Sequence, residues 1–173
     1  MSIYTLQGQT PRIDSTVYVA PDANVIGDVT IGPRSSVWFS TTLRGDTAPI
    51  TIGEETNIQD LSMAHADPGK PLIIGNRVTI GHRCVVHGCV IEDDCLIGMG
   101  AIIMNEARIG RGSIVGAGAI ILEKTVIPPF SLVVGSPGQV KKTYDETILA
   151  TIYRTAKVYM ERGAFYQEHL QIL

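Results

Sequence analysis

A mainly β solenoid followed by one helix is the fold class that the sequence predicts. The 173 residues include 22 Ile and 15 Val but only 10 Leu, and β-branched side chains fit a pleated strand better than a helix. The aliphatic residues also recur every six positions, a period that neither a helix nor an ordinary strand has. We expect a single domain over residues 1–173, with the solenoid over 11–130, a connector over 131–142 and the helix over 143–168.

Nineteen six-residue units with an aliphatic first position make up the predicted solenoid. The second position is often Gly and the fifth is usually small, as in Ser35, Cys84 and Ala101. Short strands joined by tight corners satisfy this pattern, because the first position points inward and the fifth shares the narrow interior. The pattern resembles the hexapeptide-repeat family of left-handed parallel β-helices, in which three units form one triangular coil. That resemblance implies the left hand and about six to seven coils. The first positions are Ile13, Val19, Val25, Ile31, Val37, Leu43, Ile52, Ile58, Ala64, Ile74, Ile80, Val86, Ile91, Ile97, Ile103, Ile109, Val115, Ile121 and Ile127.

The six-residue register breaks at three places. Residues 47–51 contain three extra residues, residues 67–73 contain four, and residues 86–90 are one short. Insertions leave a solenoid as loops on one face, which is often the functional one. All three breaks lie beside histidines or charged residues, and we therefore expect the functional site near them.

The chain after the solenoid has the pattern of an amphipathic helix. Thr143 and Glu146 have the spacing of a capping box. Apolar residues then recur at helical spacing from Ile148 to Met160, and Gly163 follows. We expect this helix to fold back along the solenoid and cover an apolar side.

Charge and cysteine usage exclude several classes of protein. The net charge of −3 provides no basic footprint for nucleic acid or for an anionic membrane. No leader pattern is visible at the N-terminus, and no apolar run approaches the roughly 18 residues of a membrane span, so we expect a soluble, cytoplasmic protein. Cys84, Cys89 and Cys95 lack a paired pattern, and we interpret them as reduced, buried small residues.

Three histidines fall inside the repeat, and two of them occupy matching positions. We name the face that carries the Leu43, Ala64 and Val86 units face A, and the face that carries the Ile58 and Ile80 units face C. Arg44, His65 and His87 then occupy the second position of face A in consecutive coils. Neighbouring strands lie about 4.8 Å apart, so these side chains form a column, and two stacked imidazoles can reach one metal ion. Asp60 and His82 share the third position on face C, across a corner, with Gln59 beside them.

A third ligand from another face could join the first two only around the corner or from a second subunit. Packing face A of one chain against face C of the next would bring His65 and His87 to the neighbour's His82. We therefore predict a homotrimer with three metal sites at its interfaces. Three histidines and an open fourth position are the ligand set of catalytic zinc, whose bound water has a pKa near 7.

Several blocks of the sequence resemble the γ-class carbonic anhydrase family. These blocks are Arg44-Gly45-Asp46, Asn57-Ile58-Gln59-Asp60, His65, and residues 81–89 with His82 and His87. The similarity covers nearly the whole chain. It implies zinc, with Fe2+ or Co2+ as the alternatives, bound by His65 and His87 of one subunit and His82 of another. It also implies a carbonic anhydrase-like lyase that converts carbon dioxide reversibly to bicarbonate.

The resemblance also implies roles for the polar neighbours. Gln59 would hydrogen-bond the hydroxide at the metal, and Asn57 would help to shape the pocket. Arg44 would pair with Asp46 and, across the interface, with Asp60, since a guanidinium fork matches carboxylates. A further residue, Tyr159 on the helix, resembles a tyrosine that lines the pocket in one branch of the family, and a plain core tyrosine is the other interpretation.

One departure from the family pattern concerns proton transfer. Well-characterised members carry an acidic loop with glutamates that export protons. This chain has Thr47 after Asp46, and only the short stretch 67–71 after His65. Fast hydration of carbon dioxide needs proton export as well as hydroxide. We therefore expect weak activity, with Asp67 or Glu92 as a weak substitute.

Three other functions stay open. Hexapeptide-repeat acyltransferases share the solenoid and an ending like that at residues 133–138, but a single histidine acts as base there, and three histidines in register would be unexplained. Hydrolysis of acyl-CoA thioesters by the same zinc site is the second alternative. A metal-binding protein without turnover is the third.

Overall fold

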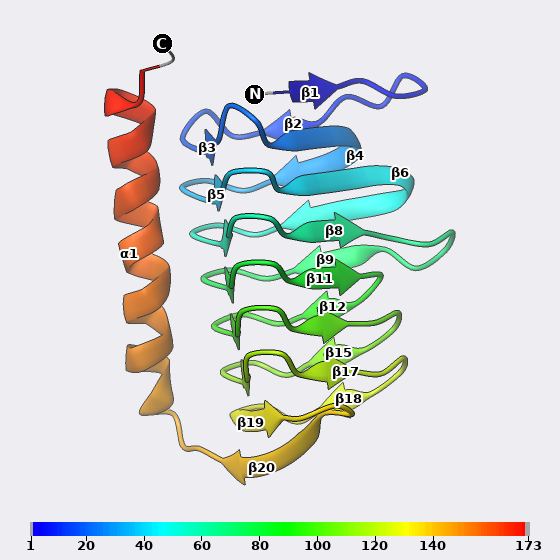
Figure 1. Ribbon diagram of the computed structural model, residues 1–173, viewed down its shortest axis with the longest axis vertical. Coiled ribbons are helices and arrows are strands. Elements are labelled where there is room, and N and C mark those ends of the chain that lie inside the picture. The colour runs from blue at the N-terminus through cyan, green and yellow to red at the C-terminus, as the bar shows by residue number, and fades with distance from the viewer. Residues whose placement is uncertain (1, 172–173) are drawn as a thin grey trace.

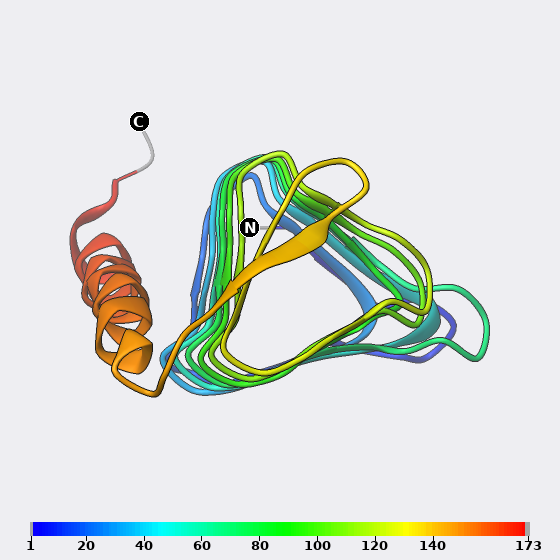
Figure 2. The same cartoon turned by 90° about the horizontal axis from the view of Figure 1, so that it is seen from below.

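The computed structural model describes residues 2–171 and is a parallel β-solenoid with one C-terminal helix (Figure 1). Seen along its axis, the solenoid is triangular (Figure 2). We name the third face, which carries the Ile52 and Ile74 units, face B. The chain passes through face B, face C and face A in turn, and the strands of the solenoid pair in parallel with those of the next coil. The predicted fold class is therefore confirmed.

The strands divide among the three faces, with β4 (Asn24–Ile31) and β6 (Thr42–Ile52) running from face A around the corner into face B. The other strands of face A are β1 (Ser2–Tyr4), β8 (Met63–His65), β11 (Val85–His87), β14 (Ile102–Ile103) and β17 (Ile120–Ile121). Face B adds β2 (Arg12–Ile13), β9 (Leu72–Ile74), β12 (Val90–Ile91), β15 (Arg108–Ile109) and β18 (Val126–Ile127). Face C consists of β3 (Tyr18–Val19), β5 (Ser36–Val37), β7 (Asn57–Ile58), β10 (Thr79–Ile80), β13 (Leu96–Ile97), β16 (Ile114–Val115) and β19 (Ser131–Val134).

The first and fifth positions of the units form the core, as the repeat predicts. Ile58, Ile80 and Ile97 are fully buried one above another on face C. Buried hydroxyls at the fifth position are satisfied by carbonyls of the next coil, as in the bond from Thr41 Oγ1 to the Gln59 oxygen at 2.9 Å. The cysteines are free and buried, as predicted, and burial raises the pKa of Cys89 and of Cys95 to about 12. At neutral pH these thiols are protonated and serve as packing groups.

The solenoid continues beyond both predicted boundaries. Residues 131–142, predicted as a connector, contain β19, which pairs in parallel with β16, and most of β20 (Gln139–Thr143), which pairs antiparallel with β19. β20 covers the last coil, whose backbone would otherwise be an open sheet edge. At the other end, β1 pairs with β4, before the predicted start at residue 11.

The C-terminal helix, α1, spans Ile148–His169 and begins five residues later than predicted. Thr143 is the last residue of β20, so the capping-box prediction was wrong. The N-cap residue is Thr147, whose side chain makes no capping hydrogen bond. Thr143 is extended because it pairs with Ser131 in the antiparallel ladder between β19 and β20. The helix can therefore begin only after this ladder. Over residues 2–171, no helix is long and apolar enough to cross a membrane.

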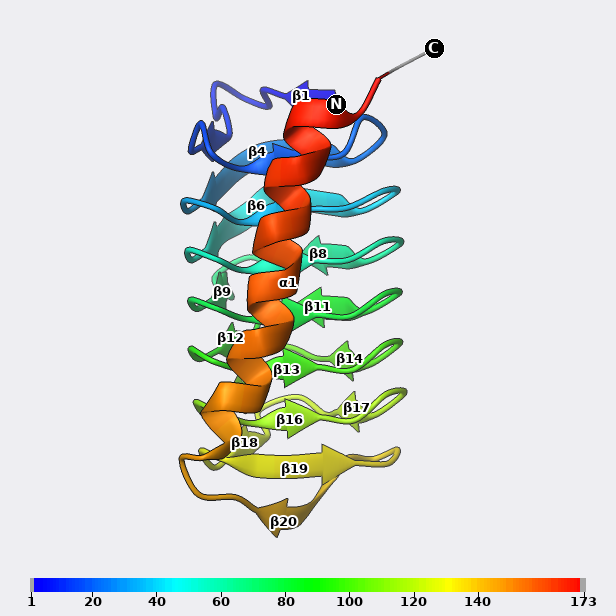
Figure 3. The same ribbon diagram turned by 90° about the vertical axis from the view of Figure 1, so that its left-hand side faces the viewer.

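The helix lies along face C, as predicted for a covering element (Figure 3). It buries Ile152, Ala156 and Gly163, and a Cβ on Gly163 would approach the Cβ of Ser36 to 3.3 Å. An aromatic cluster fills the contact near the first coils, with ring centroids 5.1–5.6 Å apart. Its members are Tyr18, Trp38, Tyr159 and Tyr166.

Charged residues stack along the corner between faces B and C. Asp94 Oδ1 accepts a hydrogen bond from Arg77 Nε at 2.6 Å, and its Oδ2 accepts one from Arg111 Nε at 2.9 Å. Burial by itself raises the pKa of the Asp94 carboxyl, but the two guanidinium groups outweigh it and hold that pKa below its ordinary value. The carboxylate form of Asp94 therefore stabilises the stacking of three coils.

This pairing predicts an acid-dependent loss of stability. Because the folded pKa lies below the unfolded one, the contribution of Asp94 is complete above about pH 4 and is lost as the pH falls towards the folded value. Asp94→Asn should lower the free energy of unfolding at pH 7 and weaken its dependence on pH below 4, as measured by urea unfolding. The control is Glu168→Gln, because Glu168 is 78% exposed. An Asp94→Asn protein with the wild-type pH profile would contradict this assignment.

Candidate metal centre

The predicted column of side chains on face A is present. Arg44 on β6, His65 on β8 and His87 on β11 are paired residues of three consecutive strands. Leu43, Ala64 and Val86 stand directly inside them and are fully buried. The aliphatic first position therefore fixes the register, and the register brings the two imidazoles together with their centroids 5.0 Å apart.

One nitrogen of each imidazole faces the other imidazole, and the second nitrogen of each ring lies against a side-chain oxygen. His65 Nδ1 lies 3.0 Å from His87 Nε2. The second nitrogen of His65, Nε2, lies 2.8 Å from Asp46 Oδ1, and Arg44 donates to the other oxygen of Asp46. Burial by itself raises the pKa of Asp46, but the hydrogen bonds from His65 and Arg44 lower it below its usual value. Asp46 is therefore an acceptor that keeps the proton of His65 on Nε2.

The second nitrogen of His87 is held by a residue that sequence reasoning missed. His87 Nδ1 lies 2.8 Å from Asn105 Oδ1, and Asn105 Nδ2 donates to Asp67 Oδ2 at 2.8 Å. Asn105 is buried and occupies the third position of the Ile103 unit, one coil beyond His87 on the same face. An amide at a buried position of an aliphatic repeat is the signal that could have identified it.

The arrangement of these hydrogen bonds fits a metal ion. With the outer nitrogens of both rings donating protons, the facing nitrogens of His65 and His87 present two lone pairs to each other at 3.0 Å. A cation between them, a proton or a metal ion, removes that repulsion. Two nitrogen ligands of tetrahedral zinc lie about 3.3 Å apart, which is close to the separation in this structure.

The predicted residues of face C form a second group of polar side chains, apart from the histidine column. His82 Nδ1 lies 2.9 Å from Asp60 Oδ2, and the imidazole is 41% exposed. Gln59 is buried beside them and donates from Nε2 to Asn57 Oδ1 at 3.1 Å. Asn57 Nδ2 donates in turn to Thr79 Oγ1 at 3.0 Å. Asp60 therefore holds the proton of His82 on Nδ1 and leaves Nε2 free.

The structure also places the remaining predicted residues. Tyr159 packs edge-on against Trp38 at 5.4 Å and contacts the core. Burial raises the pKa of its phenol, and the nearby charge of Asp60 adds to the shift. Of the two carboxylates considered for proton transfer, Asp67 lies 3.9 Å from His87 Nε2. Glu92 follows β12 on face B, away from the histidine column, and accepts a hydrogen bond from Arg108 Nε at 2.8 Å.

The three histidines are not brought together within one chain. Among residues 2–171, no group of three His, Cys, Asp or Glu side chains is placed to hold a metal ion. His65 and His87 lie on face A, whereas His82 follows β10 on face C. The predicted packing of face A directly against face C does not fit, because α1 already covers face C. A three-histidine centre would therefore require face A of one copy and the corner beside His82 of another.

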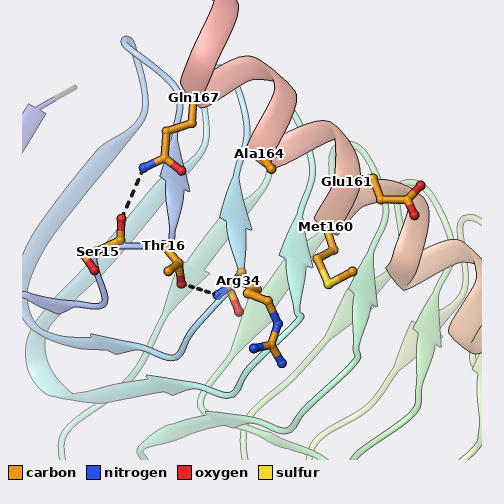
Figure 4. A pocket seen from close by; sticks show the side chains of 9 residues that line it. Ser15, Thr16, Arg34, Met160, Glu161, Ala164 and Gln167 are labelled. Carbon is orange, nitrogen blue, oxygen red and sulfur yellow. Dashed lines mark hydrogen bonds between the residues drawn. The ribbon is translucent and has the colours of Figure 1, made fainter.

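A cavity of about 460 Å³ between α1 and the first coils is separate from these residues (Figure 4). Its lining includes Thr16, Arg34, Met160 and Gln167, and no histidine. Arg34 in this cavity is already paired with Glu55 at 2.5 Å. None of the residues predicted for the metal site lines this cavity.

Comparison with known proteins identifies the family to which this solenoid belongs. Residues 88–123 match the family described as bacterial transferase hexapeptide (six repeats). A carbonic anhydrase from Geobacillus kaustophilus is 40% identical over 95% of this chain and 91% of its own length. The mitochondrial gamma carbonic anhydrase 2 of Arabidopsis thaliana is 39% identical over 88% of this chain and 57% of its own length. A Bacillus cereus structure with a proposed acetyltransferase activity is 38% identical, covers 98% of both chains and has a TM-score of 0.95.

These similarities show that the chain is a hexapeptide-repeat protein. Within that class it belongs to the γ-class carbonic anhydrase family.

Proposed function

We propose that the protein is a homotrimeric metalloenzyme that hydrates carbon dioxide reversibly to bicarbonate. The observation that carries this proposal is the pair of complementary half-sites. One consists of His65 and His87 with their free nitrogens 3.0 Å apart, and the other of His82 held by Asp60. The family of the chain supports the same function. The active site would then be complete only between two subunits.

Apolar side chains around the histidine column support packing against a second copy. Outward positions of face A carry Met63, Val85 and Ile102, which are partly exposed, in strands that pair with one another. Leu61 and Met99, at the corner between faces C and A, are 61% and 59% exposed. A patch of this kind beside polar groups marks a protein interface.

The side chains of both half-sites are oriented for metal binding. His65, His87 and the neighbour's His82 would hold the ion, with Fe2+ and Co2+ as alternatives to zinc. When bound, zinc lowers the pKa of a water ligand to about 7 and makes hydroxide available at neutral pH. Because Gln59 donates its amide proton to Asn57, its Oε1 remains as the acceptor available to a ligand in the site.

Charged residues near the histidines would join the subunits. Arg44 already donates to Asp46 within one chain and is 38% exposed. Its remaining donors would reach Asp60 of the neighbouring subunit, which also orients His82. Tyr159 would line the pocket from α1. Proton export would be slow, because the loop after His65 is short, and we propose weak turnover.

Acyl transfer is the second candidate function, because the Bacillus cereus structure has a proposed acetyltransferase activity. One histidine is enough as the base in such a reaction, so hydrogen-bond acceptors behind three histidines would have no function. Hydrolysis of acyl-CoA thioesters and a metal-binding role without turnover remain as further alternatives, and the assays below separate them. We also propose a cytoplasmic location and a small-molecule substrate, without nucleic acid or membrane partners.

Subunit complementation tests the shared metal site. His82→Ala should abolish zinc binding, and so should the double variant His65→Ala/His87→Ala, because each removes one half of every site. In a ring of three, a mixed trimer of the two variants has one intact interface. Co-refolding equal amounts should therefore restore about a quarter of the wild-type zinc content, measured by elemental analysis of purified trimers. The control is His169→Ala, which changes an exposed histidine on α1. Zinc retained by the His82→Ala trimer, or no recovery in mixed trimers, would refute the shared site.

Activity assays separate the candidate reactions. The zinc-loaded protein, and the protein loaded anaerobically with Fe2+, should accelerate carbon dioxide hydration in stopped flow. Gln59→Ala should lower kcat about 10- to 100-fold through loss of one hydrogen-bond partner beside the metal ion, while Gln167→Ala serves as the control. Hydrolysis of acyl-CoA without hydration of carbon dioxide would favour the thioesterase. Acetyl transfer by the metal-free protein would favour the transferase. No detectable activity in any of these assays would favour a role without turnover.

A further inference from the structure

We propose that Asn105, oriented by Asp67, is a positioning residue that holds His87 as the tautomer protonated on Nδ1. This inference rests on the metal centre proposed above, because the fixed tautomer leaves His87 Nε2 unprotonated towards His65. Nothing in the six-residue pattern requires an asparagine at position 105, because the units before and after it on the same face have Gly88 and Glu123 at this position. The three side chains form a continuous chain of hydrogen bonds from the loop after β8 to the ligand pair.

The orientation of the Asn105 amide follows from its partners. Its Nδ2 donates to Asp67 Oδ2 at 2.8 Å, and a carboxylate can only accept. Its Oδ1 therefore faces His87 Nδ1, which lies 2.8 Å away. A carbonyl oxygen is also only an acceptor, so the proton lies on His87 Nδ1. One carboxylate thus determines the protonated nitrogen of the imidazole through the amide.

A tight turn fixes the position of Asp67. The backbone N–H of Lys70 donates to the backbone carbonyl oxygen of Asp67 at 2.9 Å, and Gly69 has a φ of +75°. Proline at the second position and a glycine with positive φ at the third are typical of a type II turn. The four extra residues after His65 therefore form a short projection at the corner between faces A and B (Figures 1 and 2).

The shortened unit after His87 makes room for Asn105. Gly88 has a φ of +50°, and a Cβ there would lie 2.3 Å from Asn105 Oδ1. Any side chain at position 88 would displace the amide from His87. We call the hydrogen-bonded chain from Asp67 through Asn105 to His87 the brace. Two of the three register breaks, the insertion at 67–73 and the deletion at 86–90, therefore contribute to it.

The functional consequence is a preorganised ligand. A histidine ligand needs its other nitrogen held by a hydrogen-bond partner, and loss of such a partner lowers metal affinity about 10- to 100-fold. Asp46 has this role for His65 and Asp60 for His82. For His87 the partner is the neutral Asn105, with the charge of Asp67 one hydrogen bond further away.

Three variants and one matched control test the brace. Asn105→Leu removes both hydrogen bonds. Asn105→Asp keeps an acceptor for His87 but places two carboxylates together. The double variant Asn105→Asp/Asp67→Asn exchanges donor and acceptor and restores both bonds. The control is Asn76→Leu, because Asn76 pairs with Asp93 at 3.2 Å in a corner without a histidine.

Two measurements are made on purified trimers of each protein. Long-range 1H–15N spectra of the metal-free protein identify the tautomer of His87, and competition with a chelator gives the affinity for zinc. The wild type should show the Nδ1-protonated tautomer. Asn105→Leu should lose it and bind zinc about 10- to 100-fold more weakly. The double variant should recover both properties, and Asn76→Leu should change neither.

The outcomes distinguish this inference from the proposed function. If Asn105→Leu keeps the Nδ1-protonated tautomer and the wild-type zinc affinity, the positioning role is wrong. If the double variant stays as impaired as Asn105→Leu, the hydrogen-bonded brace is wrong. A wild type that binds no zinc, but whose His87 tautomer follows Asn105 as expected, would support the brace and overturn the metal centre.

Discussion

In-register stacking of equivalent short strands is the constraint on which the rest of this structure depends. Backbone hydrogen bonds join each coil to the next. The aliphatic side chain at the first position packs against the equivalent side chain one coil away, as Ile58 does against Ile80. A shift of one residue would turn these buried side chains outwards. Every other position of a unit is therefore fixed relative to its counterparts, and polar side chains at equal positions must stack.

The same constraint brings the histidines on face A of the repeat together. Histidines at the second position of face A lie one strand spacing apart. At this spacing their facing ring nitrogens lie 3.0 Å from each other, which is close to the separation of two ligands of one ion. Breaks in the register leave the core intact and add loops or remove bulk at the corner next to these histidines. The scaffold therefore keeps its regular packing while the corner acquires the irregular side-chain arrangement that coordination chemistry requires.

A common pattern joins the three histidines, although they lie on two faces. Each has one ring nitrogen against an oxygen: Asp46 for His65, Asn105 for His87 and Asp60 for His82. A histidine that acts alone as a base needs one such partner, whereas three histidines with preset tautomers are what a metal centre needs. Because the two groups face outwards on different sides, the proposed chemistry and the proposed assembly depend on each other.

Much of this architecture was predictable from local periodicity. The six-residue spacing, together with the three-unit coil of the resembled family, is enough to predict the core, the triangular coil and the column of Arg44, His65 and His87, because stacking is periodic in sequence as well as in space. It could not predict where the solenoid ends, since β20 forms only because the last coil has an uncovered edge. The start of α1 was shifted for the same reason.

The sequence by itself therefore determined which residues share a face, and only the tertiary structure decided which atoms meet. Asn105 illustrates the difference. Its contact with His87 depends on the turn that fixes Asp67 and on the space left by Gly88, and these features come from three separate coils. Hydrogen bonds of this kind depend on distances of a few tenths of an ångström between side chains, and a repeat pattern specifies only the order of positions.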